Sequence, residues 1–169
     1  MLSEALKGID IISHQAAYQD HMPDFSRFFQ VNTVGTALIY ELIVQKKLPV
    51  RKIIVASSQA VYGEGQFSCG EHGFFQPAPR ARQQLEKGQW EVECPLCQRP
   101  SQPCQLEEHH ANPFNQYSVS KLAEERAALG LGWLHGIPTV AFGTRMCRGH
   151  VNLCSITIQG SAAFSLVAR

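Results

Sequence analysis

The chain has 169 residues, of which 44% are hydrophobic and 17% charged, and its formal net charge is +1. This length suits one domain with an apolar core, and the balanced charge excludes both a basic nucleic-acid-binding protein and a charged disordered tail. The apolar runs are far shorter than the roughly 18 residues of a membrane span, and the N-terminal segment lacks the basic start of a signal peptide. We therefore expect a cytoplasmic protein with reduced cysteines.

Three short apolar segments predict buried parallel strands. They are Ile9–Ser13, Lys52–Ser57 and Thr139–Phe142, and each is rich in β-branched residues and too short for a helix. Longer segments with a different periodicity lie between them. This alternation predicts an α/β fold with a parallel sheet and flanking helices.

Two of the longer segments are expected to be helices. Between residues 24 and 46, apolar and small residues recur at the helical period, and Val31, Val34 and Leu38 add a second apolar stripe. A helix that is apolar on two sides packs on the sheet and on something else, such as another subunit. Between residues 115 and 134, a second helix is expected, with Asn115 as its N-cap.

Residues 64–112 interrupt this alternation with a segment that is rich in proline and cysteine. A connection of this length is usually functional or carries its own structure. It contains two pairs of metal-ligand type with two-residue spacing, Cys69-Gly70-Glu71-His72 and Cys94-Pro95-Leu96-Cys97. Such pairs are typical of a tetrahedral zinc site, and three sulfurs with one nitrogen would saturate the ion as a structural metal.

Other interpretations of these cysteines stay open. Cys94 and Cys97 alone have the spacing of a redox pair, and the four residues could also be unrelated. Further ligands are available nearby if His72 does not bind the metal: Cys104, His109 and His110. The segment has few aliphatic residues, so metal binding could supply the folding free energy that its core lacks.

Tyr117 and Lys121 stand four residues apart on the second predicted helix, so they share one face. A free tyrosine has a pKa near 10, and a nearby ammonium group favours the phenolate that could accept a proton from a hydroxyl group. A solvated helix face is the alternative. Ser57 and Ser58 follow the middle strand, where ligands of parallel sheets gather, although serines there can also serve local turns.

Four motifs together resemble the extended short-chain dehydrogenases/reductases, which include NAD-dependent nucleotide-sugar epimerases and dehydratases. They occur in family order between about Gly8 and Ala141. In chain order they are His14-Gln15-Ala16-Ala17, Asn32-Thr33-Val34-Gly35-Thr36, Ser57-Ser58-x-x-Val61-Tyr62-Gly63 and Tyr117-x-x-x-Lys121. The cysteine-rich insert also resembles one found in a subset of bacterial nucleotide-sugar epimerases.

The resemblance implies a role for each matching residue. Tyr117 would be the general base and acid toward a sugar hydroxyl, and Ser58 would align the substrate. Lys121 would bind the nicotinamide ribose and make Tyr117 more acidic. The residues implied to contact NAD are Ala16, Ala17, Asn32, Tyr117 and Lys121.

The residues after Ser58 favour one activity within this family. Dehydratases carry Asp-Glu there, whereas this chain has Gln59-Ala60, so the acid that expels water is missing. The resemblance therefore implies an epimerase, in which NAD takes a hydride from a sugar carbon and returns it to the other face. It suggests a deoxysugar nucleotide such as dTDP-rhamnose as substrate, and a homodimer formed through the pair of long helices.

Two parts of the family pattern are missing from this sequence. The glycine-rich turn that holds the cofactor pyrophosphate is not found, and the match fades after Ala141. We therefore expect an incomplete Rossmann-like sheet: a partial epimerase/dehydratase domain over residues 1–141, with the zinc-binding insert at 64–112 and a divergent tail at 142–169. Such a fragment, from a truncated gene or a shifted reading frame, would be weakly active or inactive. The alternative is a non-catalytic, zinc-containing remnant or interaction module.

Overall fold

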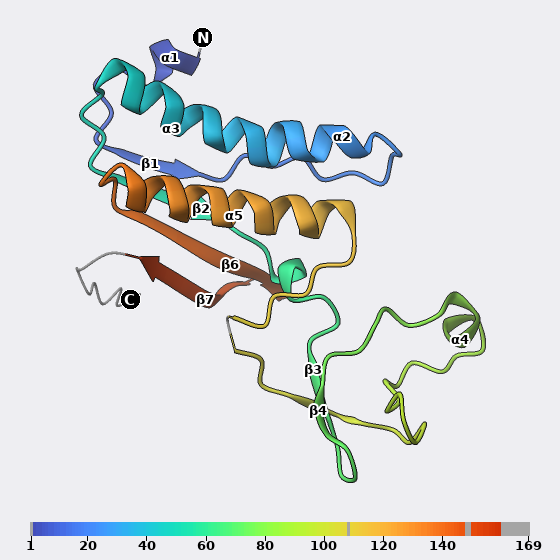
Figure 1. The fold of residues 1–169 in the computed structure, drawn as a ribbon. Helices are drawn as coiled ribbons and strands as arrows, with labels where there is room; N and C mark the ends of the chain where they lie inside the picture. Colours follow the sequence, from blue (N-terminus) through green and yellow to red (C-terminus); the bar gives the residue numbers. More distant parts are fainter. Residues whose placement is uncertain (1, 108, 148–149, 160–169) are drawn as a thin grey trace. The chain divides into compact units, whose positions relative to one another are not determined.

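The computed structural model describes residues 2–107, 109–147 and 150–159, with side chains described up to Gly143. The chain divides into two compact units (Figure 1). The first consists of Met1–Gln59 and Asn115–Arg169, and the second of Ala60–Phe114. The second unit contains the cysteine-rich insert, and each unit is described below on its own.

A four-stranded sheet forms the centre of the first unit. Its strands β1 (Ile11–His14), β2 (Lys52–Ala56), β6 (Thr139–Cys147) and β7 (His150–Gln159) are hydrogen-bonded in that order. The first three are parallel, as predicted, and the register places Ile53 of β2 between Ile12 and Thr139. β7 pairs antiparallel with β6, so part of the predicted divergent tail extends the sheet. Residues 160–169 of that tail lie outside the described residues.

The first predicted helix is present but is not a uniform α-helix. It consists of α2 (Phe25–Phe28), a π-helical segment η1 (Phe29–Val34) and α3 (Gly35–Lys46), after a short α1 (Leu2–Ala5) at the start of the chain. The backbone of Lys47 then turns into the left-handed conformation, with φ at 50°, and ends the helix. Within the π-helical segment, Asn32 is fully buried, so the wider turn directs a polar side chain into the interior.

The second predicted helix is α5 (Gln116–Leu134), and Asn115 is its N-cap as expected. The Asn115 side chain accepts a hydrogen bond from the Ser118 backbone N–H at 2.8 Å. In return, the Ser118 hydroxyl accepts one from the Asn115 N–H at 3.1 Å. This reciprocal capping box fixes the first turn of α5, which carries Tyr117.

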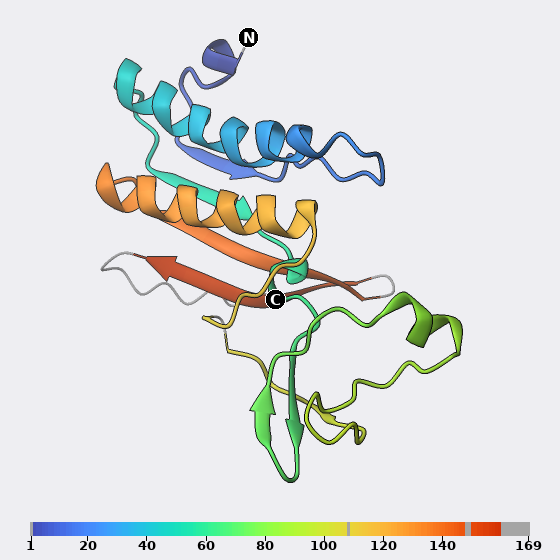
Figure 2. The same ribbon diagram turned by 45° about the vertical axis from the view of Figure 1, so that its right-hand side comes forward.

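Both long helices cover the same face of the sheet, where they lie side by side (Figures 1 and 2). Burial alternates along β2, whose Ile53 and Val55 side chains point toward the helices. The buried cluster on this face joins α3, β2 and α5 with the turns that flank β2 and β6: Ile39, Tyr40, Ile43, Val50, Ile53, Val55, Ala128 and Ile137. The prediction of a parallel sheet with flanking helices is therefore confirmed.

The second unit has a smaller antiparallel sheet, with β3 (Gln66–Cys69) between β4 (Gly73–Phe75) and β5 (Gln102–Cys104). A 3-10 turn η2 (Gln59–Tyr62) leads into this unit, and a short helix α4 (Arg82–Glu86) lies within it. The two ends of the unit meet where the Asn112 backbone N–H donates to the Val61 carbonyl at 2.9 Å. Among the described residues, no helix is both long and apolar enough to cross a membrane.

Candidate functional site

Lys121 lies in the interior of the first unit and forms an ion pair on its own helix. Its side chain is 2% exposed, and its Nζ lies 2.5 Å from Oε2 of Glu124, whose side chain is fully buried. Burial raises the pKa of Glu124 above its usual value, while the Lys121 ammonium and the Thr36 hydroxyl act in the opposite direction. The charge of Lys121 is therefore largely compensated within the protein.

His14, the last residue of β1, connects the sheet to this ion pair. Its Nε2 lies 2.8 Å from the Thr36 hydroxyl and 3.7 Å from Oε1 of Glu124. The Thr36 hydroxyl also lies 2.7 Å from the Asn32 carbonyl, to which it can donate, and the tautomer of His14 decides which of His14 and Thr36 donates to the other. Burial and then the charge of Lys121 lower the pKa of His14, which favours the neutral ring.

Asn32 uses its side-chain amide entirely for internal hydrogen bonds. Its oxygen accepts from the Tyr18 backbone N–H at 2.6 Å, and its nitrogen donates to the Tyr18 carbonyl and to the Ser120 hydroxyl. Asn32 thus joins the loop after β1 to α5. Ala16 and Ala17, which the sequence assigns to the cofactor, lie exposed on that loop.

The other predicted catalytic residues lie near the same elements. Tyr117 is half-buried on the first turn of α5, one turn before Lys121, and Ser58 is buried directly after β2. The neighbouring Ser57 hydroxyl donates to Oε2 of Glu125 at 2.7 Å, which ties the end of β2 to α5. The roles of Tyr117 and Ser58 toward a substrate stay predictions.

Sequence reasoning missed the two glutamates of α5. Glu124 and Glu125 follow Lys121 by three and four residues, so helical spacing places them within reach of the same end of the sheet. This helical spacing from Lys121 is the sequence signal from which their position could have been predicted. A pair of adjacent acids on an otherwise amphipathic helix is usually solvated, whereas here Glu124 is buried and Glu125 is half-buried.

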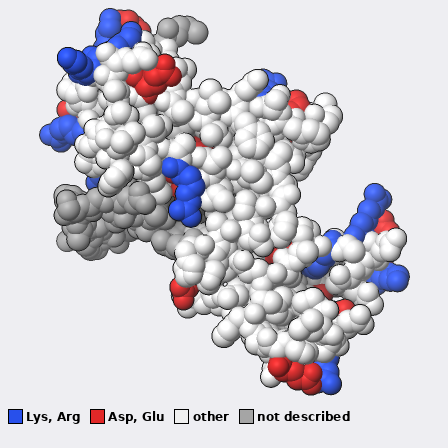
Figure 3. Space-filling model, in the orientation of Figure 1, with Lys and Arg blue, Asp and Glu red and all other residues white. Residues whose placement is uncertain are grey.

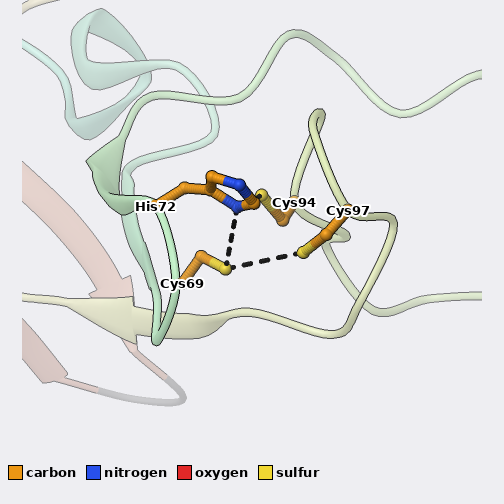
Figure 4. Close-up of side chains that lie close together, drawn as sticks. All are labelled: Cys69, His72, Cys94 and Cys97. Atoms are coloured by element: carbon orange, nitrogen blue, oxygen red, sulfur yellow. Dashed lines mark hydrogen bonds between the residues drawn. The ribbon is translucent and has the colours of Figure 1, made fainter.

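In the second unit, the four predicted metal ligands converge (Figure 4). Four ligand atoms, one from each residue, all lie within 4.8 Å of one another. They are the sulfurs of Cys69, Cys94 and Cys97 and a ring nitrogen of His72. Cys69 ends β3, and His72 lies in the turn before β4. The other two ligands lie in a tight turn closed by hydrogen bonds from Gln98 N–H to the Cys94 carbonyl and from Cys94 N–H to the Arg99 carbonyl, both at 2.8 Å.

The cluster favours a thiolate beside an imidazolium. Backbone N–H groups of Glu71 and His72, and then the His72 ring, lower the pKa of Cys69 to about 6. The thiols of Cys69 and Cys94 raise the pKa of His72 in return. The spare candidates Cys104, His109 and His110 do not belong to this cluster in the described part of the chain.

The face that carries α2, α3 and α5 is mostly uncharged (Figure 3). Several large apolar side chains are exposed on α2, η1 and α3: Phe25, Phe29, Val31, Val34, Leu38 and Val44. They include the second apolar stripe seen in the sequence. Exposed apolar residues in this number on one helical segment mark an interaction surface more often than plain solvent contact.

Comparisons with known proteins agree with this fold. The family model described as "Male sterility protein" (NAD_binding_4) matches residues 1–150. The dTDP-L-rhamnose 4-epimerase of Burkholderia thailandensis is 34% identical over 119 residues, which is 69% of this chain and 32% of that protein.

Two solved structures with bound NAD are similar in fold. A short-chain dehydrogenase/reductase superfamily protein from Agrobacterium tumefaciens is 23% identical, with a TM-score of 0.54 over 83% of this chain and 32% of that one. UDP-glucuronic acid 4-epimerase from Bacillus cereus is also 23% identical, with a TM-score of 0.53 over 83% of this chain and 33% of that one. The chain thus spans about a third of the length of these relatives. It belongs to the NAD_binding_4 family, among the extended short-chain dehydrogenases/reductases that include nucleotide-sugar epimerases and dehydratases.

Proposed function

We propose that this chain carries the catalytic segment of an NAD-dependent nucleotide-sugar epimerase. The observation that carries the proposal is a buried cluster in which Nε2 of His14, at the end of β1, lies 3.7 Å from Oε1 of Glu124, while Oε2 of Glu124 pairs with Lys121 on α5. The cluster lies at the carboxyl end of the parallel sheet, where such folds bind their ligands. The family membership favours this function over a non-catalytic, zinc-containing module.

In this proposal, NAD supplies a hydride acceptor, and the residues of this chain handle the proton. Tyr117 would take the proton from a sugar hydroxyl and later give it back, and Ser58 would hold that hydroxyl in position. Lys121 would bind the nicotinamide ribose; because its side chain is only 2% exposed in the free chain, this role requires the ammonium group to move toward the surface. Beside it, Oε1 of Glu124 is buried without a hydrogen-bond partner.

The substrate that we propose is a nucleotide-linked hexose with a free hydroxyl group at the carbon that is inverted. Relatives that act on dTDP-L-rhamnose and on UDP-glucuronic acid share this feature. Gln59 and Ala60 follow Ser58 in place of the acidic pair of the dehydratases, which supports epimerisation over water elimination.

The proposal is tested by titrating the chain with NAD and by following sugar inversion with NMR. We expect binding weaker than micromolar, because the sequence has no glycine-rich turn; several charge-assisted hydrogen bonds of about 1.5–3 kcal/mol each are then lost. At millimolar NAD we expect slow interconversion of dTDP-hexose epimers, which Tyr117→Phe lowers by at least about 100-fold. Micromolar NAD binding by this chain, or interconversion that does not depend on Tyr117, would contradict the proposal.

For the second unit, we propose a structural zinc ion held by Cys69, His72, Cys94 and Cys97. Around a tetrahedral zinc ion, two sulfurs lie about 3.7 Å apart, and a sulfur and an imidazole nitrogen about 3.6 Å apart. The separation is 3.6 Å from Cys69 Sγ to Cys97 Sγ. His72 Nδ1 lies 3.6 Å from Cys69 Sγ and 3.5 Å from Cys94 Sγ. These three edges match a zinc tetrahedron that uses Nδ1 of His72.

Metal analysis tests the zinc proposal. Purified chain should contain about one equivalent of zinc, and four protein ligands leave no position for a catalytic water. Cys94→Ser should lose most of the metal, whereas Cys104→Ser, which alters a cysteine of the same unit outside the cluster, should keep it. Less than a tenth of an equivalent in wild-type protein would contradict the proposal.

The exposed apolar side chains of η1 and α3 support a homodimer in which this face meets its copy. Val31, Val34 and Leu38 recur at helical spacing and are 39%, 59% and 41% exposed. Sedimentation should show a dimer that Val34→Asp and Leu38→Asp convert to monomer, and a wild-type monomer at high concentration would contradict it.

Since the zinc ligands must be reduced to bind metal, we also infer a cytoplasmic location.

A further inference from the structure

Two thiols of the cluster in the second unit face each other directly. The Sγ atoms of Cys69 and Cys97 are 3.6 Å apart, and Figure 4 shows both sulfurs pointing into the same space. The sulfurs of Cys69 and Cys94 both contact Nδ1 of His72, at 3.6 and 3.5 Å, and the Cys94 thiol also lies within hydrogen-bonding reach of the other two thiols. The closely spaced pair in the sequence, Cys94 and Cys97, is therefore not the only pair placed for oxidation.

The path of the chain also favours a bond between Cys69 and Cys97. β3, which ends in Cys69, is already paired with β5, which begins five residues after Cys97. A disulfide there would link the end of β3 to the turn that precedes β5, and the two sulfurs would have to approach from 3.6 Å to about 2.05 Å. It would also close a longer loop than a Cys94–Cys97 bond, which removes more entropy from the unfolded chain.

The three thiols differ in their access to solvent. Cys69 is 7% exposed and Cys94 is 1% exposed, whereas Cys97 is partly exposed. A small oxidant that reaches the cluster from solvent thus meets Cys97 first. The neighbouring thiol of Cys69 is then in place to resolve the oxidised sulfur.

We propose that Cys69 and Cys97 form a modification site for hydrogen peroxide, at which a disulfide forms when the cluster holds no metal. One of the two sulfurs, as a thiolate, attacks one peroxide oxygen, so that an S–O bond forms, the O–O bond breaks and water leaves. The other sulfur then attacks the oxidised one, so that the S–S bond forms, the S–O bond breaks and a second water leaves. Two thiols are oxidised and one hydrogen peroxide is reduced to two waters.

The inference rests on the proposed zinc site, because zinc and the disulfide exclude each other. A disulfide removes two of the four ligands, and two remaining ligands do not make a closed zinc site. Conversely, sulfurs bound to zinc share their electron pairs with the metal and attack peroxide more slowly. The cluster would thus exist either in a zinc-bound form or in a disulfide form. A dithiol reductant would reduce the disulfide, after which the four ligands could bind zinc again.

The experiment compares full-length chain in zinc-loaded and chelator-treated form. Zinc content is measured first; each form is then treated with hydrogen peroxide, alkylated without reduction and mapped by mass spectrometry. We expect the Cys69–Cys97 disulfide in the metal-free form, at a rate at least about tenfold above that of the zinc-loaded form. Cys104→Ser should behave as wild type, and Cys97→Ser should slow the loss of free thiols within the cluster.

The outcomes separate the two proposals. A Cys94–Cys97 disulfide as the main product, or equal rates with and without zinc in protein that binds zinc, would overturn the inference and leave the zinc site standing. A Cys69–Cys97 disulfide in protein that neither contains zinc nor takes it up would support the modification site, and would overturn the zinc site and the protection by metal.

Discussion

The ammonium of Lys121 is paired with the carboxylate of Glu124 at 2.5 Å, and both side chains are buried. The sequence pattern assigns Lys121 to the cofactor ribose and to Tyr117, yet in the free chain its charge is directed to an acid three residues further along α5. A ligand that takes over Lys121 must therefore compete with, or share, this internal counter-ion. Glu124 deserves the first mutational test for that reason.

Glu124→Gln should destabilise the first unit by about 3 kcal/mol, because it leaves the Lys121 ammonium buried without a counter-ion. Denaturant titration measures this loss. Replacing both partners with apolar residues, in Lys121→Met with Glu124→Leu, should recover most of the stability. The matched control is Glu125→Gln, which alters the adjacent half-buried acid and should cost about 1 kcal/mol through the Ser57 hydrogen bond. Equal losses for the two glutamine variants would contradict a special role of Glu124.

His14 should make stability depend on pH below neutrality. Its pKa is lowered in the folded chain, so between the unfolded value of 6.5 and the lower folded value, the unfolded state binds more protons. The contribution of neutral His14 is thus present above pH 6.5 and is lost as the pH falls through the folded pKa. We expect the free energy of unfolding to fall more between pH 7.5 and pH 5 for wild type than for His14→Asn.

Comparing the pH profiles of wild type and His14→Asn separates the effect of His14 from that of the buried Glu124, which both proteins contain. The pKa of Glu124 is raised in the folded chain, so Glu124 contributes stability that increases as the pH falls, opposite to His14. His135→Asn alters an exposed histidine at the end of α5 and should follow the wild-type profile. If the free energy of unfolding of His14→Asn had the same pH dependence as that of wild type, His14 would have the same pKa in the folded and unfolded chain, which would contradict the prediction.

Gly132 and Gly130 provide a matched pair on α5. A Cβ at Gly132 would lie 2.2 Å from the Thr139 hydroxyl oxygen and 2.8 Å from the Ile137 carbonyl oxygen, whereas a Cβ at Gly130 would meet nothing within 4 Å. Gly132→Ala should destabilise the chain by about 1–3 kcal/mol, because the helix must move away from β6. Gly130→Ala should stabilise it by up to about 1 kcal/mol through higher helix propensity. Thermal unfolding should show a midpoint below that of wild type for Gly132→Ala and a midpoint at or above it for Gly130→Ala.

Removing the proposed zinc should loosen the second unit and leave the first intact. Val61 and Val92 are its only buried aliphatic side chains among the described residues, so the metal would carry much of its stability. Chelator-treated chain should be cut by trypsin at Arg80, Arg82 and Lys87 much faster than zinc-loaded chain, while cleavage within α5 stays slow. Cleavage that is equally slow in both forms would mean that the unit is stable without metal.

The sequence was sufficient for the elements that depend on local pattern. The alternating β-branched segments, the N-cap at Asn115 and the paired ligands around Cys69 and Cys94 are local signals, and the structure contains each of them. The π-helical segment was not foreseen, because it depends on where Asn32 finds partners, and these come from Tyr18 and Ser120, far away along the chain.

The same reason explains what was missed at the candidate site. Helical spacing shows that Glu124 is near Lys121, but burial decides that the two are paired, and burial depends on how α5 packs against β1 and α3. The sequence also did not show that β6 extends to Cys147 and pairs with β7, because neither segment has a clear period. Tertiary contacts therefore decided both results.

The hydrogen bond from Asn112 to Val61 brings the entrance and the exit of the second unit together. Whatever lies between these two residues begins and ends at the same place, so its length does not change the distance that the chain must cover from β2 to α5. Next to this point, Gly63 adopts a φ of 62°, and a Cβ there would collide with the Asn112 carbonyl. The paired residues Val61 and Asn112 thus mark a position at which the insert could be exchanged for a short turn or for a foreign domain with adjacent termini.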